Sequence, residues 1–180
     1  MRRKGMMLFW AMGLLIVFNA CGENEENADV DLEKEAEDIS TEFLETLYNV
    51  EDPDVVDESD SPEEMADYLE EMVDKYEPYF TEEELEELVN KRFFSKPDEA
   101  ASKQDSTIEM KDLELEVDET DEESEWKFDH TFTLVFEDEA GEEIETADVT
   151  GQITVIDESG DLKINRYYDE GFPMDMLEPL

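Results

Sequence analysis

The chain of 180 residues carries 57 acidic and 13 basic side chains, which gives a formal charge of −44 at pH 7. A surface this acidic repels the phosphates of nucleic acid, so nucleic-acid binding is excluded as its function. One histidine and one cysteine cannot build the common zinc sites, and a single cysteine leaves no internal disulfide.

The N-terminus has the layout of a secretory signal peptide. Arg2, Arg3 and Lys4 form a positive region, and the uncharged apolar segment 6–18 follows it. The polar residue Asn19 follows this segment, which is shorter than the roughly 20 apolar residues that a membrane-spanning helix needs. We therefore predict that residues 1–20 are a signal peptide that is removed during export.

The end of this leader, Val17-Phe18-Asn19-Ala20-Cys21, resembles the lipobox of bacterial lipoproteins of the Gram-positive type. The resemblance implies that the Cys21 thiol receives a diacylglycerol and becomes the first residue of the mature protein. Two acyl chains hold a protein stably on a membrane, whereas one chain holds it only marginally. The expected location is the extracytoplasmic face of the cell membrane. The alternative is an ordinary signal peptide cut elsewhere, or an uncleaved anchor, in which Cys21 has no part.

Residues 21–31 are acidic, polar and nearly free of large apolar side chains. Such a composition predicts a flexible tether. Residues 32–180 are then expected to form a single domain, since their number suits one compact domain with its own core.

Apolar residues at helical spacing predict three helices at the start of this domain. The first helix ends before Pro53, and its buried stripe consists of Leu32, Ala36, Ile39, Phe43 and Leu47. The second begins at the capping-box pattern Ser61–Glu64 and ends at Pro78, and the third begins at a similar pattern, Thr81–Glu84. Residues 95–106 are predicted to be a loop.

After Thr107 the apolar period falls to about two, which predicts four antiparallel strands. A shift in the alternation predicts a β-bulge near Asp112. Gly151 is expected to mark a bend in the third strand. The second strand has the clearest inner face, which consists of Trp126, Phe128, His130, Phe132, Leu134 and Phe136. The same alternation in the fourth strand predicts that Leu162, Ile164, Arg166 and Tyr168 point inward.

Three N-terminal helices followed by four strands predict an α+β domain, with the helices packed on a bent four-stranded antiparallel sheet. This element order, with a bulged and glycine-bent sheet, resembles the NTF2-like and cystatin-like folds. In those folds the helices lie in the concavity of the sheet, and NTF2-like domains use that concavity to bind small ligands. The chain is also similar to small exported lipoproteins of Gram-positive bacteria with such a fold.

His130, Arg166 and Tyr168 are the candidate pocket residues, since all three fall on the predicted inner face. A lone histidine on an apolar face is more often a core residue than a catalyst. An inward arginine needs a carboxylate or a ligand as its partner, unless its long side chain reaches solvent at a sheet edge. The hypothesis of a shared pocket requires His130 and Arg166 to lie on the same face of the sheet.

The sequence contains no motif of a nucleophilic or phosphate-binding enzyme, and we predict no cofactor and no metal site. Its acidic runs lack the spacing of a calcium loop, so the acidity is interpreted as adaptation to salt or alkaline medium, with cation binding as the alternative.

We therefore expect a membrane-tethered, non-enzymatic domain that binds a protein or small-molecule ligand. One alternative is an NTF2-like pocket enzyme that uses His130 as acid or base. Another is a structural or accessory cell-surface lipoprotein. The sequence leaves the identity of the ligand and the oligomeric state open.

Overall fold

Four helices and one four-stranded sheet make up the part of the chain that the computed structural model describes, residues 23–52, 61–118 and 124–177. The strands pair antiparallel in the order β1-β2-β3-β4. The elements are α1 (Glu23–Tyr48), α2 (Pro62–Tyr76), α3 (Glu82–Asn90), α4 (Lys96–Gln104), β1 (Ser106–Asp118), β2 (Glu125–Asp138), β3 (Glu143–Glu158), β4 (Asp161–Glu170) and the 3-10 helix η1 (Met174–Leu177). The predicted α+β class with an antiparallel sheet is confirmed, but the described residues form four helices rather than three.

Helix α4 replaces the predicted loop at residues 95–106, so that prediction is wrong. Pro97 lies in the first turn, where its missing N–H has no intrahelical partner to lose, and Lys103 lies in the last turn, where the helix dipole favours a cation. The helix buries Ala100 and Ala101, whose side chains are too small to produce a visible apolar stripe in the sequence. It ends at Asp105, which adopts a left-handed conformation with φ of +52°.

Helix α1 begins at Glu23, so the predicted flexible tether at residues 21–31 is wrong from residue 23 onward. No glycine or proline occurs between Glu23 and Asp52, and glutamate and alanine favour helix. Extending a helix that is already packed on a sheet avoids the cost of nucleation. Cys21 and the predicted signal peptide lie outside the described residues.

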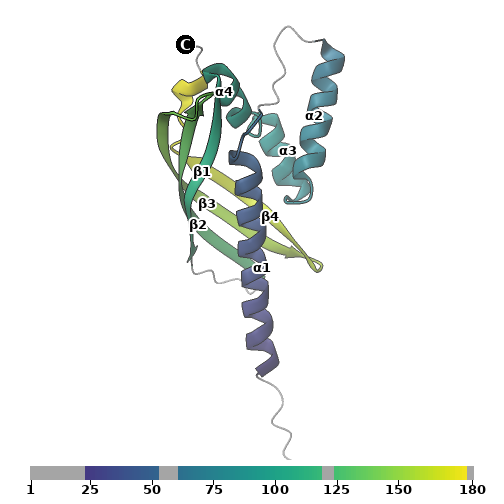
Figure 1. The fold of residues 1–180 in the computed structure, drawn as a ribbon. Helices are drawn as coiled ribbons and strands as arrows, with labels where there is room; N and C mark the ends of the chain where they lie inside the picture. The colour runs from purple at the N-terminus through teal and green to yellow at the C-terminus, as the bar shows by residue number, and fades with distance from the viewer. Residues whose placement is uncertain (1–22, 53–60, 119–123, 178–180) are drawn as a thin grey trace, which may run out of the picture.

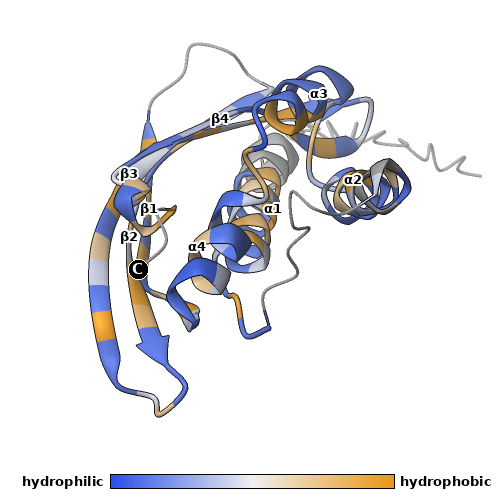
Figure 2. Ribbon diagram, turned by 90° about the horizontal axis from the view of Figure 1, so that it is seen from above, coloured by the Kyte–Doolittle hydropathy of each residue, from blue (hydrophilic) through white to orange (hydrophobic). Residues whose placement is uncertain are grey.

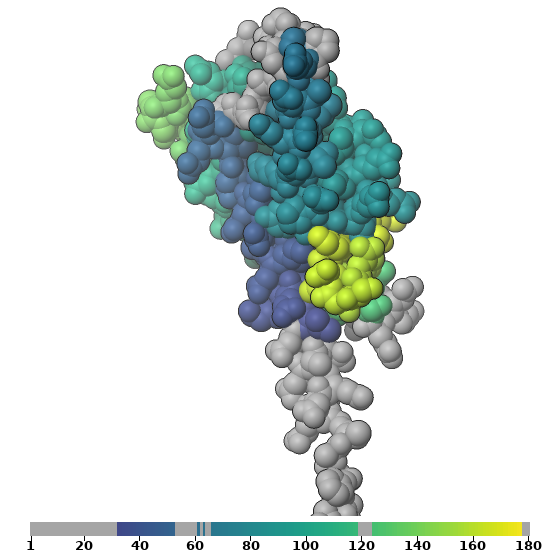
Figure 3. Space-filling view, turned by 90° about the vertical axis from the view of Figure 1, so that its right-hand side faces the viewer, coloured from purple at the N-terminus to yellow at the C-terminus, as the bar shows by residue number. Residues whose placement is uncertain are grey.

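The sheet curves around α1, which runs along its inner face (Figures 1 and 2). The predicted stripe of α1 is confirmed, since Ala36, Phe43 and Leu47 are buried and Leu32 and Ile39 are partly buried against the same core. The neighbouring Leu44 and Tyr48 are buried as well. Helix α3 lies beside β4, and α2 lies next to α3 on the side of α1 that faces away from the sheet (Figures 2 and 3). The hydrophobic core therefore lies between α1 and the concave face of the sheet.

Three β-bulges interrupt the strand pairing. The bulge between Lys111 and Glu114 in β1 confirms the prediction, and Asp112 there has a left-handed φ of +54°. In β3, Phe136 pairs with Glu145 and Glu137 with Glu143, so Ile144 is an extra residue. In β4, Thr154 pairs with Arg166 and Val155 with Ile164, so Asn165 is the extra residue. Bulges bend a strand and change which side chains face inward.

Other segments of the chain pair with part of each edge of the sheet. At β1, Val50 and Ile108 exchange two backbone hydrogen bonds of 2.9 Å. At β4, residues 79–81 pair with Ile164, and the Tyr167 N–H donates to Glu84 Oε1 at 2.8 Å. These contacts occupy the start of β1 and the middle of β4, so a partner cannot add a strand to the sheet at those positions.

Gly151 of β3 is expected to tolerate no side chain. A Cβ atom there would lie 2.2 Å from the Tyr168 carbonyl oxygen and 2.8 Å from Asp169 Cα, and both are backbone atoms. We expect Gly151→Ala to lower the free energy of unfolding by about 2 kcal/mol, measured by urea denaturation. The control is Gly141→Asn, a turn position with φ of +76° and open space around it, where asparagine is tolerated. Equal stability of Gly151→Ala and the wild type would show that β4 can move away.

Candidate functional site

The predicted inward orientation of Arg166 and Tyr168 is wrong. The extra residue Asn165 shifts the alternation of β4 by one position, so that Tyr167 is buried and its two neighbours are exposed. Tyr167 is 4% exposed and Tyr168 is 45% exposed. His130 points into the core, so it and Arg166 lie on opposite faces of the sheet. This placement contradicts the predicted pocket of His130, Arg166 and Tyr168.

Tyr167 and Asp169 occupy the inner positions of β4 instead, and they meet Tyr48 of α1. We call Tyr48, Tyr167 and Asp169 the tyrosine–aspartate cluster. The Tyr48 hydroxyl donates to Asp169 Oδ2, and the Tyr167 hydroxyl lies 3.3 Å from the same oxygen. The two hydroxyl oxygens are 3.3 Å apart. The apolar alternation of the sequence does not predict this cluster, and the only signal for it is the polar pair Asn165-Arg166, which interrupts the alternation.

Burial controls the protonation of the tyrosine–aspartate cluster. It raises the pKa of Asp169 above its usual range, although hydrogen bonds from Tyr48 and the charge of Lys96 act in the opposite direction. It also raises the pKa values of Tyr48 and Tyr167 well above their usual range. Both hydroxyls therefore stay protonated at neutral pH and donate hydrogen bonds. The arrangement ties α1 to β4 and offers no tyrosinate base.

His130 is enclosed in the core and has no polar partner. The residue is 1% exposed, and its ring stacks on Tyr167 and on Phe132 with ring centroids 5.6 Å apart in both pairs. Neither ring nitrogen has a hydrogen-bond partner. Burial lowers the pKa of His130 to about 4, while the charge of Asp129 acts in the opposite direction. The imidazole is therefore neutral at pH 7 and out of reach of a substrate, which a general base must contact.

A surface cavity of about 690 Å³ lies between the C-terminal end of α4, the β2–β3 turn and η1. We call it the hairpin groove. Its lining residues are Gln104, Asp105, Asp138, Glu139, Ala140, Ile144, Glu145 and Met176. His130 does not line it.

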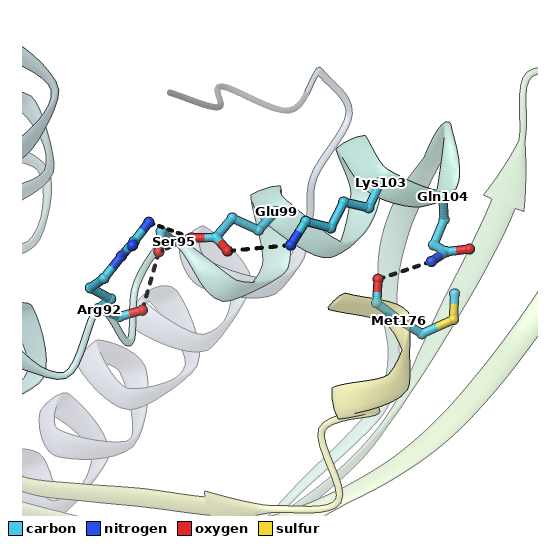
Figure 4. Close-up of polar contacts among 6 residues, drawn as sticks. All are labelled: Arg92, Ser95, Glu99, Lys103, Gln104 and Met176. Carbon is cyan, nitrogen blue, oxygen red and sulfur yellow. Dashed lines mark hydrogen bonds and ion pairs between the residues drawn. The ribbon is translucent and has the colours of Figure 1, made fainter. Parts of the chain in front are cut away.

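Side-chain hydrogen bonds fix the two walls of the hairpin groove. On one wall, Gln104 Nε2 donates to the Met176 carbonyl oxygen at 3.0 Å and holds η1 against α4 (Figure 4). On the other wall, Asp138 Oδ1 accepts hydrogen bonds of 2.9 Å from the backbone N–H groups of Ala140 and Glu142. These hydrogen bonds hold η1 against α4 and define the conformation of the β2–β3 turn.

Helix α4 is itself held in place at its other end. Glu99 accepts a hydrogen bond of 2.8 Å from Ser95 and one of 3.1 Å from Arg92, and it lies 4.0 Å from the Lys103 ammonium (Figure 4). The Ser95 hydroxyl also donates to the Arg92 carbonyl oxygen at 3.1 Å. Glu99 thus engages the basic residue of α4 nearest to the groove.

A second, smaller cavity of about 230 Å³ lies where the end of α1 meets α2. Lys75 is the one basic residue in its lining, which is otherwise polar, acidic and apolar, and which includes Glu51, Asp52, Glu71 and Asp98. In the described part of the chain no group of three or more histidine, cysteine, aspartate or glutamate side chains is arranged to hold a metal ion. The acidic lining is therefore not a preformed metal site.

Comparisons with known proteins give no family for this chain. No family model and no curated protein matches the sequence. Among solved structures, a periplasmic fragment of TraM is similar at 13% sequence identity, with a TM-score of 0.43, over 84% of this chain and 98% of that chain. This similarity is too low to assign a shared function. Within the described residues, no helix has the length and apolar character that crossing a membrane requires.

Proposed function

We propose that the chain is a lipoprotein, anchored through Cys21 at the extracytoplasmic face of a cell membrane, whose α+β domain binds a partner and catalyses no reaction. The positive and apolar leader and the lipobox-like residues before Cys21 support the anchor. The partner is a protein or a small-molecule ligand, and binding takes place on the outer surface of the domain.

One observation carries the non-enzymatic part of the proposal, namely that α1 fills the concave face of the sheet. Phe43 and Tyr48 are each at most 1% exposed and pack where a pocket would otherwise open. His130, the candidate acid or base, lies beneath them without a hydrogen-bond partner. A pocket enzyme would need this space to be open to its substrate.

An NTF2-like or cystatin-like relationship is part of the proposal. It is supported by the position of α1 within the curve of the sheet, by the bulge at Asp112 and by the close contact of Gly151 with β4. In this interpretation the domain keeps the architecture of those folds and uses their concavity as a core.

Replacing Cys21 by alanine tests the anchor. In a Gram-positive host fed labelled palmitate, we expect the wild type to be labelled and found with the membrane, because the thiol is the acceptor of the lipid. We expect Cys21→Ala to remain unlabelled and to be released or kept as precursor. Glu23→Gln, which leaves the cysteine and the leader intact, is the control. Undiminished label in Cys21→Ala would refute lipidation at this residue.

A further inference from the structure

We infer that the hairpin groove docks a basic peptide segment of a partner protein. An apolar side chain of that segment inserts against Ile144 and Met176, and its lysine or arginine side chains face the acidic rim. This inference rests on the proposed binding function and gives it a surface and a class of partner.

The apolar part of the groove is built by a bulge. Ile144 is the extra residue of β3, since the residues on either side of it pair with neighbouring residues of β2. Its side chain is 44% exposed. Met176, the other large apolar side chain in the lining, is 9% exposed. Bulges often redirect a side chain next to a binding site, and here the redirected side chain is a large apolar one.

The charged residues that line the groove are all acidic. Asp105, Asp138, Glu139 and Glu145 line it, and none of the lining residues is basic. Lys103, in the last turn of α4, lies beside Glu99 outside the lining. Acidic groups around an apolar floor complement a segment that carries both positive charge and an apolar side chain, and such charges speed association and select the partner.

The charge of the chain itself argues against an occupant from the same protein. Residues 178–180 include Glu178, whose negative charge an acidic rim would repel. A second copy would bring a net charge of −44. A single metal ion does not suit the site either, since the described residues include no suitable ligand cluster and the floor is apolar.

The binding experiment uses residues 22–180, which is the mature chain without the lipid-bearing Cys21, and fluorescent peptides at about 0.15 M ionic strength, where charges are screened beyond about 8 Å. The probe is a short lysine–leucine peptide. One comparison peptide replaces the leucines by serine at the same charge, and another replaces the lysines by glutamate. We expect the lysine–leucine peptide to bind most tightly by fluorescence anisotropy, because it alone satisfies both the floor and the rim. Equal affinity of the lysine–serine peptide would overturn the inference.

Two pairs of variants locate the binding. We expect Ile144→Asp to weaken the lysine–leucine peptide by about tenfold, whereas Val117→Asp, an equivalent change at a side chain that is 54% exposed elsewhere, should have little effect. Glu139→Lys should weaken it similarly, and Glu86→Lys on α3 should not. All four positions are exposed, so urea unfolding should confirm that each variant folds. Equal losses within each pair would mean general attraction to an acidic surface and would overturn the inference.

The other occupants are tested with the same reagents. Removing residues 178–180 should leave the affinity unchanged, and a large increase would identify the tail as the occupant and overturn the inference. Sedimentation should show no dimer that Ile144→Asp dissociates, since such a dimer would make a second copy the occupant. Failure of peptide binding leaves the Cys21 labelling result intact, and failure of labelling leaves the groove result intact. The two proposals can therefore fail separately.

Discussion

A His130→Leu variant is expected to be more stable than the wild type. In the wild type the two ring nitrogens of His130 are buried without a hydrogen-bond partner, and an unpaired buried polar group costs about 1–3 kcal/mol. Leucine has a similar size and presents no polar atom to the rings of Tyr167 and Phe132. We expect the free energy of unfolding at pH 7 to rise by about 1–3 kcal/mol.

The difference in the free energy of unfolding between His130→Leu and the wild type should grow as the pH falls. The pKa of His130 is about 4 in the folded chain, against 6.5 for an unperturbed histidine. Between these values the unfolded chain binds more protons than the folded chain, so the stability of the wild type declines from about pH 6.5 down to about pH 4. The decline levels off at about 3 kcal/mol, since one pKa unit corresponds to about 1.4 kcal/mol. His130→Leu lacks this decline.

Asp169 contributes to the pH dependence with the opposite sign. Its pKa is raised in the folded chain, so the folded chain binds more protons there, and stability falls as the pH rises through that range. This contribution is present in the wild type and in His130→Leu alike. The difference between the two unfolding curves therefore isolates His130.

Urea unfolding of the wild type, His130→Leu and His130→Gln between pH 7 and pH 4 provides the measurement. Glutamine removes the titration but keeps a buried polar group, so His130→Gln should flatten the pH dependence without the gain in stability at pH 7. Titration of His130 near its ordinary pKa of 6.5, followed by NMR, would contradict an enclosed imidazole.

The sheet could be predicted from the sequence as far as its apolar alternation reaches. In β2 the inner residues are large and apolar, so only one orientation buries them, and the structure confirms it. The bulge at Asp112 was visible because apolar residues change phase there. The bulge at Asn165 left only the polar pair Asn165-Arg166 as a signal, and this pair did not decide the register because arginine and tyrosine occur on either face of a strand. Because of this one extra residue, Tyr167 and Asp169 lie on the inner face of β4, where Arg166 and Tyr168 were predicted.

The hairpin groove lay beyond sequence reasoning for two physical reasons. Helix α4, which forms one wall, buries alanines too small to define a period. The bulge that exposes Ile144 lies in the acidic run Glu142–Glu145, where no alternation exists to be broken. The groove also joins segments about 30 to 70 residues apart, such as Gln104 and Met176, whose contact no local pattern reports.

Phe43→Ala is expected to cause the largest loss of stability among the variants considered, about 3–5 kcal/mol. Phe43 is fully buried on α1, and its ring contacts four other aromatic rings at centroid distances of 4.8 to 6.3 Å. These four are Tyr76, Tyr79, Phe80 and Tyr167. Phe43 thus joins α1, the end of α2 and β4, and its removal leaves a cavity that these elements cannot easily close.

Urea unfolding measures this loss, with Glu45→Ala as the matched control because Glu45 is exposed on the same helix and should change stability by less than about 0.5 kcal/mol. The result bears on function, since α1 occupies the space in which a ligand pocket would otherwise lie. A loss of several kcal/mol would mean that the concave face is a core, and binding must then use outer surfaces such as the hairpin groove. A loss below about 1 kcal/mol would mean that α1 is loosely packed there, and the concave face would become the first place to look for a substrate.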